Sequence, residues 1–340
     1  MAAANPQVTF TAPRTVEIVD AGVPEIGPRD VLVRTRCSLI SAGTEGSSYV
    51  GRQWTRDDGT VLPRYPDAPG YSNVGEVVAV GDEVERFRVG DHVTSSAGHR
   101  LFSTFPESHP VLWPAPEGVG DEDVSFCVLG CTVLNGVRMG HPQIGEAVAV
   151  IGLGVLGQLA CRYLALTGAG PIIGIDLDDF RLGLARDAGV INHALNPSAC
   201  ELREEVRALT EGRGADVVFE VTGRTETYDT AFDLARRFGT VVALGSPRWP
   251  APVDMMKLHL KALDCVGAIV SAHPEPGDQR HRWHRGANAA LFLDLAASGR
   301  MKLGPLVTHR FAYQDAAEAY PTALGERGEA LGVVFEWPEG

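Results

Sequence analysis

Three glycines near the middle of the chain have the spacing of a turn that binds phosphate. Gly152, Gly154 and Gly157 follow the apolar run Ala147–Ile151 and open a stretch of helical periodicity. The first glycine permits a tight turn, the second lets the backbone approach a pyrophosphate, and the third lets helix and strand pack closely. The pattern predicts a dinucleotide site at a helix N-terminus. Its predicted contact residues are Gly152, Gly154, Val155, Leu156 and Gly157.

A carboxylate stands where the ribose of such a dinucleotide would lie. Asp176 ends the next apolar run, about 20 residues beyond the last glycine, where it would accept hydrogen bonds from ribose hydroxyls and repel a 2′-phosphate. Leu177 follows it, and Arg181 is placed to reach the ribose edge or to cover the adenine. These residues favour NAD(H) over NADP(H). The alternative interpretation is a capped helix in a sheet that binds no cofactor.

The elements that must position these residues differ along the chain. The first third holds short valine-rich runs separated by Gly, Pro and Asp, which is typical of strands joined by turns. From about residue 119, apolar strand patterns alternate with helical ones, which predicts a doubly wound parallel sheet. The predicted elements of this part are a helix at 155–167 and strands at 147–151, 171–176, 215–220, 240–244 and 264–269. The predicted domains are 1–118, 119–272, and a C-terminal segment, 273–340, with a helix near 287–298 and a closing strand at 332–336.

Composition narrows the classes of partner. The 340 residues carry a net charge of −13, which argues against nucleic acid or an anionic membrane, since both require a basic face. No apolar run approaches the ~20 residues of a membrane span, and the N-terminus lacks the pattern of a signal peptide. The six cysteines form no C-x-x-C pair. We therefore expect a cytoplasmic protein that acts on a small molecule.

The order of the two halves resembles the medium-chain dehydrogenase/reductase superfamily. Val89–Val93 is similar to that family's barrel signature, and Ile144–Glu146 is similar to its turn before the nucleotide strand. Within the superfamily, Ser38–Glu45, Gly70–Gly75 and Gly154–Leu159 resemble a branch of bacteriochlorophyllide dehydrogenase-like oxidoreductases. The resemblance implies an α/β fold, in which a GroES-like β-barrel catalytic domain precedes a Rossmann domain and the C-terminal segment returns to the barrel.

The chain departs from the zinc alcohol dehydrogenases at the positions that resemble their catalytic ligands. A ligand cysteine is replaced by Ser41 and a ligand histidine by Tyr71, while the third position falls near Val128, in a register that the motifs leave open. A catalytic zinc needs three protein ligands and an open position. No cysteine falls between Cys37 and Cys127, so the four-cysteine structural lobe is absent as well. The expected metal content is none.

Without a metal, a hydrogen-bond donor or general acid must act on the substrate oxygen. Tyr71 is the first candidate, because it takes the place of the ligand histidine. Glu45 is the second, as a base or a ligand for substrate hydroxyls; Ser41 would orient either group, and His99 would relay protons. Each has a structural alternative: Tyr71 as a half-buried barrel residue, Glu45 as the cap of a short helix, and His99 as a core histidine.

Further cofactor contacts follow from the resemblance rather than from spacing. Loops at the carboxyl ends of the later strands would approach the nicotinamide ribose and carboxamide. They comprise Val221, Thr222, Gly223, Leu244, Gly245, Ser246, Gly267 and Ala268. The strand near Cys265–Ile269 lies, in the proteins that this chain resembles, close to a dimer contact, so we expect a homodimer.

The sequence favours an NAD(H)-dependent oxidoreductase that needs no zinc and interconverts a secondary alcohol and a ketone. The expected substrate is a polar metabolite such as a sugar, a cyclitol or a natural-product intermediate. Two alternatives stay open. One is reduction of an activated double bond in an enone or quinone, and the other is a binding protein that holds NAD(H) without catalysis.

Overall fold

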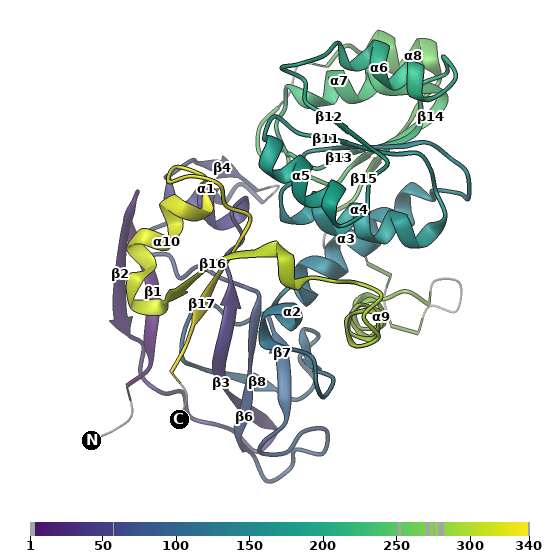
Figure 1. The fold of residues 1–340 in the computed structure, drawn as a ribbon. Helices are drawn as coiled ribbons and strands as arrows, with labels where there is room; N and C mark the ends of the chain where they lie inside the picture. Colours follow the sequence, from purple (N-terminus) through teal and green to yellow (C-terminus); the bar gives the residue numbers. More distant parts are fainter. Residues whose placement is uncertain are drawn as a thin grey trace. The chain divides into compact units, whose positions relative to one another are not determined.

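The computed structural model describes residues 4–56, 58–250, 253–269, 273–274, 276–277 and 282–338. These residues form two compact units, shown in Figure 1. Unit 1 comprises the described residues of Met1–Leu129 and His284–Gly340, and unit 2 comprises those of Gly130–Trp283. The segment 119–129, which the sequence assigned to the nucleotide domain, belongs to unit 1. Residue 272, at the second predicted boundary, lies outside the described residues.

Unit 1 is built around a seven-stranded sheet. Its strands follow the order β16-β17-β3-β6-β7-β9, with β8 also paired to β3, while β1 and β2 form a separate hairpin. The bounds are β1 Pro6–Ala12, β2 Thr15–Asp20, β3 Asp30–Leu39, β6 Asn73–Val80, β7 His92–Ser95, β8 Phe102–Pro106, β9 Leu112–Pro114, β16 Val307–Ala312 and β17 Gly332–Glu336, with a short pair β4 Trp54–Thr55 and β5 Val61–Leu62. Because β17 pairs antiparallel with β3, the C-terminal strand lies inside the sheet of the N-terminal segment.

Alternating residues of β3 explain how this sheet buries its core. Val31 and Val33 point to one face and pack against Val77, Val93 and Leu112. This is the period of two that a half-buried strand requires. A second buried cluster of the unit combines small aliphatic residues with large aromatic ones. Its largest members are Phe10, Tyr49, Tyr320, Phe335 and Trp337.

Helix α10 (Ala316–Ala323), in the C-terminal segment, contributes residues to this second cluster. Within the described part of unit 1 the helices are α1 Thr44–Tyr49, α2 Asp121–Ser125, α9 Arg285–Ala297 and α10 Ala316–Ala323, with 3₁₀ turns at Gly304–Leu306 and Tyr313–Asp315. Helix α10 contacts α1, β2 and β17. The stacked rings of Tyr49 and Tyr320, 5.5 Å apart, join α1 to α10. Residues from both ends of the sequence therefore share one core.

Unit 2 is a doubly wound sheet, as the sequence predicted. Six parallel strands follow the order β12-β11-β10-β13-β14-β15. They are β10 Val148–Ile151, β11 Ile172–Ile175, β12 His193–Leu195, β13 Ala215–Glu220, β14 Ala235–Ala243 and β15 Asp264–Gly267. The helices are α4 Val155–Thr167, α5 Asp179–Asp187, α6 Leu202–Leu209, α7 Thr227–Leu234 and α8 Met255–Lys261, and α3 Cys127–Gly140 leads into the unit. Figure 1 shows α4 and α5 on one face of the sheet and α6, α7 and α8 on the other.

The strand order reverses between β10 and β13, in the middle of the sheet. The chain first moves outward from β10 through β11 to β12, and then returns to the other side of β10 with β13. Both β10 and β13 are buried along their whole length, as strands covered by helices on two faces must be. Ligands of open parallel sheets bind at the carboxyl ends of the strands at such a switch point.

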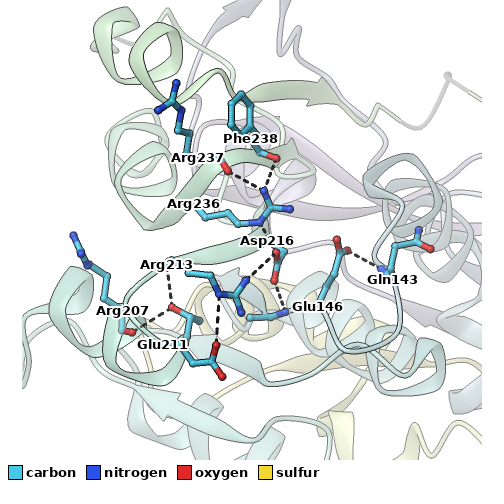
Figure 2. A network of polar contacts seen from close by, with 12 residues as sticks. Gln143, Glu146, Arg207, Glu211, Arg213, Asp216, Arg236, Arg237 and Phe238 are labelled. Carbon is cyan, nitrogen blue, oxygen red and sulfur yellow. Dashed lines mark hydrogen bonds and ion pairs between the residues drawn. The ribbon is translucent and has the colours of Figure 1, made fainter.

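At the opposite, amino end of the same strands, charged side chains join β10, β13 and β14. Asp216 accepts a hydrogen bond from Ala147 N at 2.8 Å and pairs with the guanidinium of Arg236. Arg213 lies 3.7 Å from the same carboxylate (Figure 2). We call Asp216, Arg213 and Arg236 the amino-edge cluster. With Arg237 these residues line an open cavity of about 450 Å³.

No helix in the described part of the chain is both long and apolar enough to cross a bilayer.

Candidate active site and cofactor site

The glycine turn of unit 2 needs glycine at two positions for steric reasons. Gly152 has φ +94°, and a Cβ built on it would lie 2.6 Å from Thr222 Cγ2. On Gly157 a Cβ would lie 1.9 Å from the carbonyl oxygen of Gly152. The turn after β10, the first turn of α4 and the loop after β13 are thus in direct backbone contact. Larger residues would separate them.

Gly154 differs because open space lies beside it. A Cβ on Gly154 would meet no atom within 4 Å. Gly154 is also the N-cap of α4, with an extended backbone, and it makes no side-chain cap hydrogen bond to the N–H groups at the positive end of the helix. Helix N–H groups beside open space suit the pyrophosphate of a dinucleotide. The residues present therefore fit the predicted group.

Asp176 lies directly beside this turn, at the end of β11. Its Oδ2 accepts a hydrogen bond from Leu153 N at 2.6 Å, and its Oδ1 accepts one from Asp178 N at 2.9 Å. The residue is only partly buried, and each carboxylate oxygen retains capacity for another donor. Arg181 Nε lies 3.4 Å from the carboxylate of Asp178. The structure brings the predicted ribose-binding carboxylate to the predicted phosphate turn.

The other predicted cofactor loops gather at the same carboxyl edge. A Cβ on Gly245 would lie 2.2 Å from Gly223 N, and one on Gly223 would lie 2.8 Å from the carbonyl oxygen of Ser246, so the loops after β13 and β14 are in contact. At the end of β15, Ala268 N donates to Ala243 O at 2.9 Å. The predicted cofactor residues therefore lie at the carboxyl ends of the strands of one sheet or in the loops and helix starts that follow them. They are Gly152, Gly154, Val155, Leu156, Gly157, Asp176, Arg181, Val221, Thr222, Gly223, Leu244, Gly245, Ser246, Gly267 and Ala268.

Glu220 organises this edge and was not among the sequence candidates. It ends β13, fully buried, and accepts hydrogen bonds from Thr222 N at 2.9 Å, Gly223 N at 3.1 Å and Thr227 Oγ1 at 2.8 Å. Burial, together with the nearby Glu220 charge, raises the pKa of Tyr228 far above its ordinary value. A carboxylate at the end of a buried strand is the same signal that singled out Asp176. It would have identified Glu220 as well.

In unit 1, the structure brings Ser41 and Tyr71 together. Ser41 follows β3 and Tyr71 precedes β6, and Ser41 Oγ lies 2.5 Å from the Tyr71 hydroxyl. The Tyr71 hydroxyl also lies 3.5 Å from Thr44 Oγ1. Ser41 is buried, whereas Tyr71 is partly exposed. The arrangement presents a phenol whose oxygen is held by a second hydroxyl, which is a suitable form for a proton donor.

Glu45 is buried in the first turn of α1, with a side-chain exposure of 3%. Its Oε1 accepts a hydrogen bond from Ser41 N at 2.8 Å, as in a helix N-terminus that a carboxylate closes. Its Oε2 accepts from the Tyr320 hydroxyl at 2.9 Å and lies 2.9 Å from His99 Nε2. Burial and the charge of Glu45 raise the pKa of Tyr320 well above its ordinary value. Glu45 is enclosed by protein donors rather than presented to solvent.

His99 continues this network into the core. Its Nδ1 lies 2.8 Å from Ser38 Oγ, which also accepts a hydrogen bond from Trp337 Nε1 at 2.9 Å. The His99 ring packs edge-on against Phe335, with centroids 4.9 Å apart. The side chain of His99 is fully buried. We call Ser38, Glu45, His99, Tyr320 and Trp337 the buried network.

Tyr320, Trp337 and Ser38 were not predicted, for two different reasons. Tyr320 and Trp337 are remote in sequence from Glu45 and Ser38, and only the pairing of β17 with β3 and the packing of α10 on α1 bring them near. No local pattern announces such a contact. Ser38 was noted only as the first residue of a motif, and its position on the buried face of β3 was the available signal.

Comparison with known proteins agrees with both units. A family model described as the alcohol dehydrogenase GroES-like domain matches residues 27–107, and one described as zinc-binding dehydrogenase matches residues 155–286. A protein named alcohol dehydrogenase from Cupriavidus necator is 26% identical over 386 aligned residues, covering 99% of this chain and 100% of the relative. The chain belongs to the medium-chain dehydrogenase/reductase superfamily. It is an oxidoreductase of that type.

Solved structures of similar fold span the whole length of this superfamily member. One, described as a zinc-binding dehydrogenase from Sinorhizobium meliloti 1021 and bound to NADP, has a TM-score of 0.80 at 20% identity, covering 98% of this chain and 100% of that one. Another, described as a short chain alcohol dehydrogenase from E. coli CFT073 with NADH, has a TM-score of 0.82 at 20% identity and the same coverage. At these identities the likeness shows the fold alone.

The zinc that the matching family's description implies does not fit the donors at Ser41 and Tyr71. These two positions carry neutral hydroxyls that bond to each other, whereas zinc sites in proteins use thiolate, imidazole and carboxylate ligands. Among the described residues, no group of three or more His, Cys, Asp and Glu side chains is placed to hold a metal ion. The described cysteines are all free thiols, and none of them stands at Ser41 or Tyr71.

Proposed function

We propose that this superfamily member is an NAD(H)-dependent, zinc-independent dehydrogenase that interconverts a secondary alcohol and a ketone. Its substrate is a polar metabolite such as a sugar, a cyclitol or a natural-product intermediate. The observation that carries the proposal is the pair of hydroxyls, Ser41 and Tyr71, at the positions that resemble zinc ligands. Hydroxyl chemistry at this place supports proton donation in place of Lewis-acid activation.

In the proposed reaction, unit 1 handles the proton. When bound, NAD(H) supplies the hydride chemistry of the reaction. The Tyr71 hydroxyl donates its proton to the carbonyl oxygen of the ketone and takes it back from the alcohol in the reverse direction. Ser41 Oγ, 2.5 Å away, then donates a hydrogen bond to the Tyr71 oxygen and stabilises the charge left on it. The partial exposure of Tyr71 leaves its hydroxyl accessible to a substrate.

Unit 2 binds the cofactor in this proposal, and its charges favour NAD(H). Asp176 would accept hydrogen bonds from the ribose hydroxyls, and Asp178 and Asp179 follow it closely at the start of α5. A 2′-phosphate would face these carboxylates at short range. Since one structure of similar fold holds NADP and another holds NADH, the fold itself permits either, and the residues at the ribose edge decide.

We also propose a homodimer formed through β15. This strand ends the six-stranded sheet, and Asp264, Cys265 and Gly267 on it are exposed. Ile269, just beyond it, is 63% exposed and offers an apolar side chain to a partner. An edge strand pairs readily with a second copy of itself. Sedimentation should give a dimer for the natural chain and a monomer for Ile269→Lys; a monomer for both would contradict this assembly.

The function is tested by steady-state oxidation of NADH with matched panels of polar ketones, enones and quinones. We expect turnover with a ketone, no loss of activity after chelation, and no stoichiometric zinc by metal analysis. Tyr71→Phe should lower kcat by roughly 100-fold or more, the usual contribution of a general acid, while the Kd of NADH stays the same. Turnover of enones alone would favour double-bond reduction, and tight NADH binding without any turnover would favour a binding protein.

A further inference from the structure

The hydrogen bonds of the buried network have a defined direction. Trp337 Nε1 carries a hydrogen and can only donate, so Ser38 Oγ accepts from it. The Glu45 carboxylate can only accept, so both the Tyr320 hydroxyl and His99 Nε2 donate to it. A neutral histidine that donates from Nε2 accepts at Nδ1, and the hydrogen of Ser38 Oγ is free to be donated there. With His99 neutral, the chain of donors runs from Trp337 through Ser38 and His99 to Glu45.

Glu45 is joined to Ser41 through a backbone amide rather than through a hydroxyl. The second oxygen of Glu45 accepts from Ser41 N, while the Ser41 hydroxyl bonds to Tyr71. An amide N–H does not exchange its proton in a catalytic cycle. Glu45 therefore reaches Ser41 through its backbone N–H, and together with His99 it fixes the backbone from which the Ser41 hydroxyl projects.

His99 also touches the other side of the hydroxyl pair. Its backbone N donates to Pro69 O at 2.9 Å. Its ring lies against Gly70, which has φ +103°: a Cβ there would lie 2.9 Å from ring atoms of His99 and 2.7 Å from its backbone N. Tyr71 is the next residue. A single buried histidine thus supports Tyr71 through Gly70, and supports Ser41 through Glu45.

We infer that His99, held in its Nε2–H tautomer by Ser38 and Trp337, is a positioning residue that sets the Ser41–Tyr71 hydroxyl pair and carries no proton in the reaction. Glu45 and Tyr320 help to position the same hydroxyl pair, because both are hydrogen-bonded within the buried network. The inference rests on the proposed function, because it assigns Tyr71 the proton. It differs from the sequence hypothesis, in which Glu45 acts as a base and His99 as a proton relay.

Two substitutions at His99 separate positioning from proton transfer. Gln places an amide N–H near the position of Nε2 and keeps the donor to Glu45, whereas Asn places its amide near Nδ1 and loses that donor. We expect His99→Asn to lower kcat roughly 10-fold to 100-fold, the effect of a small misplacement of reacting groups. We expect His99→Gln to recover most of that loss and to keep the pH profile of kcat. His109→Asn, at a histidine of unit 1 that hydrogen-bonds only its own loop, is the matched control.

A double-mutant cycle with Tyr71 excludes a general structural lesion. If His99 acts through the hydroxyl pair, His99→Asn should lower kcat no further in the Tyr71→Phe background. Equal fold losses in both backgrounds would overturn the inference, as would the loss of one limb of the pH profile in His99→Gln.

A ¹⁵N NMR spectrum of the histidines tests the tautomer without turnover. The expected spectrum has a protonated Nε2 and an unprotonated Nδ1 at His99, and Trp337→Phe should perturb it. A protonated Nδ1 at His99 would overturn the inference, even if the natural chain showed the proposed ketone reductase activity. Conversely, the expected spectrum in a chain that turns over nothing would reject the proposed function and leave the assigned tautomer intact.

Discussion

In the buried network of unit 1 and in the amino-edge cluster of unit 2, a single carboxylate holds several donor groups together, but the two carboxylates have different surroundings. Each centres on one carboxylate, Glu45 or Asp216, that accepts a backbone N–H and two side-chain contacts. Around Glu45 the side-chain partners are an imidazole and a phenol, both fully buried. Around Asp216 they are the guanidinium groups of Arg236 and Arg213, which are 27% and 52% exposed.

The difference in exposure determines what each carboxylate can do. Water and salt reach the arginines of the amino-edge cluster, so its ion pairs are screened and its partners can turn into solvent. The donors around Glu45 cannot turn into solvent. A donor left unpaired there keeps the full free-energy cost of its desolvation. The buried network can therefore hold one geometry, which positioning requires, whereas the exposed cluster joins strand ends with less precision.

The largest expected effect comes from replacing each carboxylate with its amide. In Glu45→Gln, one end of the amide must direct N–H at Ser41 N or at His99 and Tyr320, which are themselves donors. We expect unit 1 to lose about 1–3 kcal/mol for each buried donor that is left without an acceptor. In Asp216→Asn, Arg236 can move toward water, and we expect unit 2 to lose about 1–2 kcal/mol. Native-state hydrogen exchange at amides of β3 and of β13 measures the two units separately.

Salt provides the control for that comparison. Raising the salt concentration should narrow the difference between Asp216→Asn and the natural chain and leave the Glu45→Gln difference unchanged. Equal losses in the two units, or equal sensitivity to salt, would show that exposure does not distinguish the networks.

The sequence predicted unit 2 more completely than unit 1 because the signals of unit 2 are local. The glycine turn, the carboxylate of Asp176 and the loops after each strand are specified by short segments, and parallel pairing brings their ends to one edge. Helix α4 has the predicted bounds of Val155–Thr167, and β13 those of Ala215–Glu220. Residues within one strand or turn suffice to predict such elements.

The active-site candidates of unit 1 depend instead on contacts between distant segments. Ser41, Glu45, Tyr71 and His99 were each singled out by type and motif, but their partners could not be named. Ser38 and Trp337 are 299 residues apart in sequence. Which of the many tyrosines and tryptophans would reach Glu45 or Ser38 is decided by barrel closure and aromatic packing, and neither leaves a periodic trace in the sequence.

A smaller effect should appear at high pH, where two buried tyrosines differ. The pKa of Tyr320 is raised well above its ordinary value by burial and then by Glu45, and that of Tyr228 is raised by burial and then by Glu220. An unfolded tyrosine ionises near pH 10. Above that pH the unfolded chain binds fewer protons than the native chain, so the stability present below pH 10 is lost as the pH rises.

Phenylalanine at each position should reduce this alkaline loss in its own unit. The change in slope should approach about 1.4 kcal/mol per pH unit for each tyrosine removed. At pH 7, Tyr320→Phe should cost unit 1 about 1 kcal/mol, because Glu45 loses a donor. Tyr228→Phe should cost unit 2 a similar amount, since the Tyr228 hydroxyl donates to the carbonyl of Gly245 at 3.2 Å beside the Glu220 carboxylate. Unfolding measured from pH 7 to 11 tests this, and an unchanged alkaline slope in both variants would contradict it.

The smallest expected effect is at Phe238, in the irregular part of β14 that Arg236 closes, where the register against β13 shifts. Phe238 has φ +59° and is 63% exposed, while Arg236 donates to the carbonyls of Arg237 and Phe238 at 2.8 and 2.9 Å. A left-handed backbone costs a residue of this kind roughly 1–2 kcal/mol, and asparagine tolerates it better. The ring contact with Arg237, 5.0 Å from centroid to guanidinium, returns about 0.5 kcal/mol. We therefore expect Phe238→Asn to stabilise unit 2 by about 0.5 kcal/mol.

Phe238→Ala keeps the backbone strain and loses the ring, so it should destabilise unit 2. Hydrogen exchange at β14 measures both variants. If both substitutions destabilise unit 2 equally, the ring contact rather than the backbone strain at residue 238 sets the stability there. The amino-edge cluster would then resemble the buried network in depending on side-chain contacts.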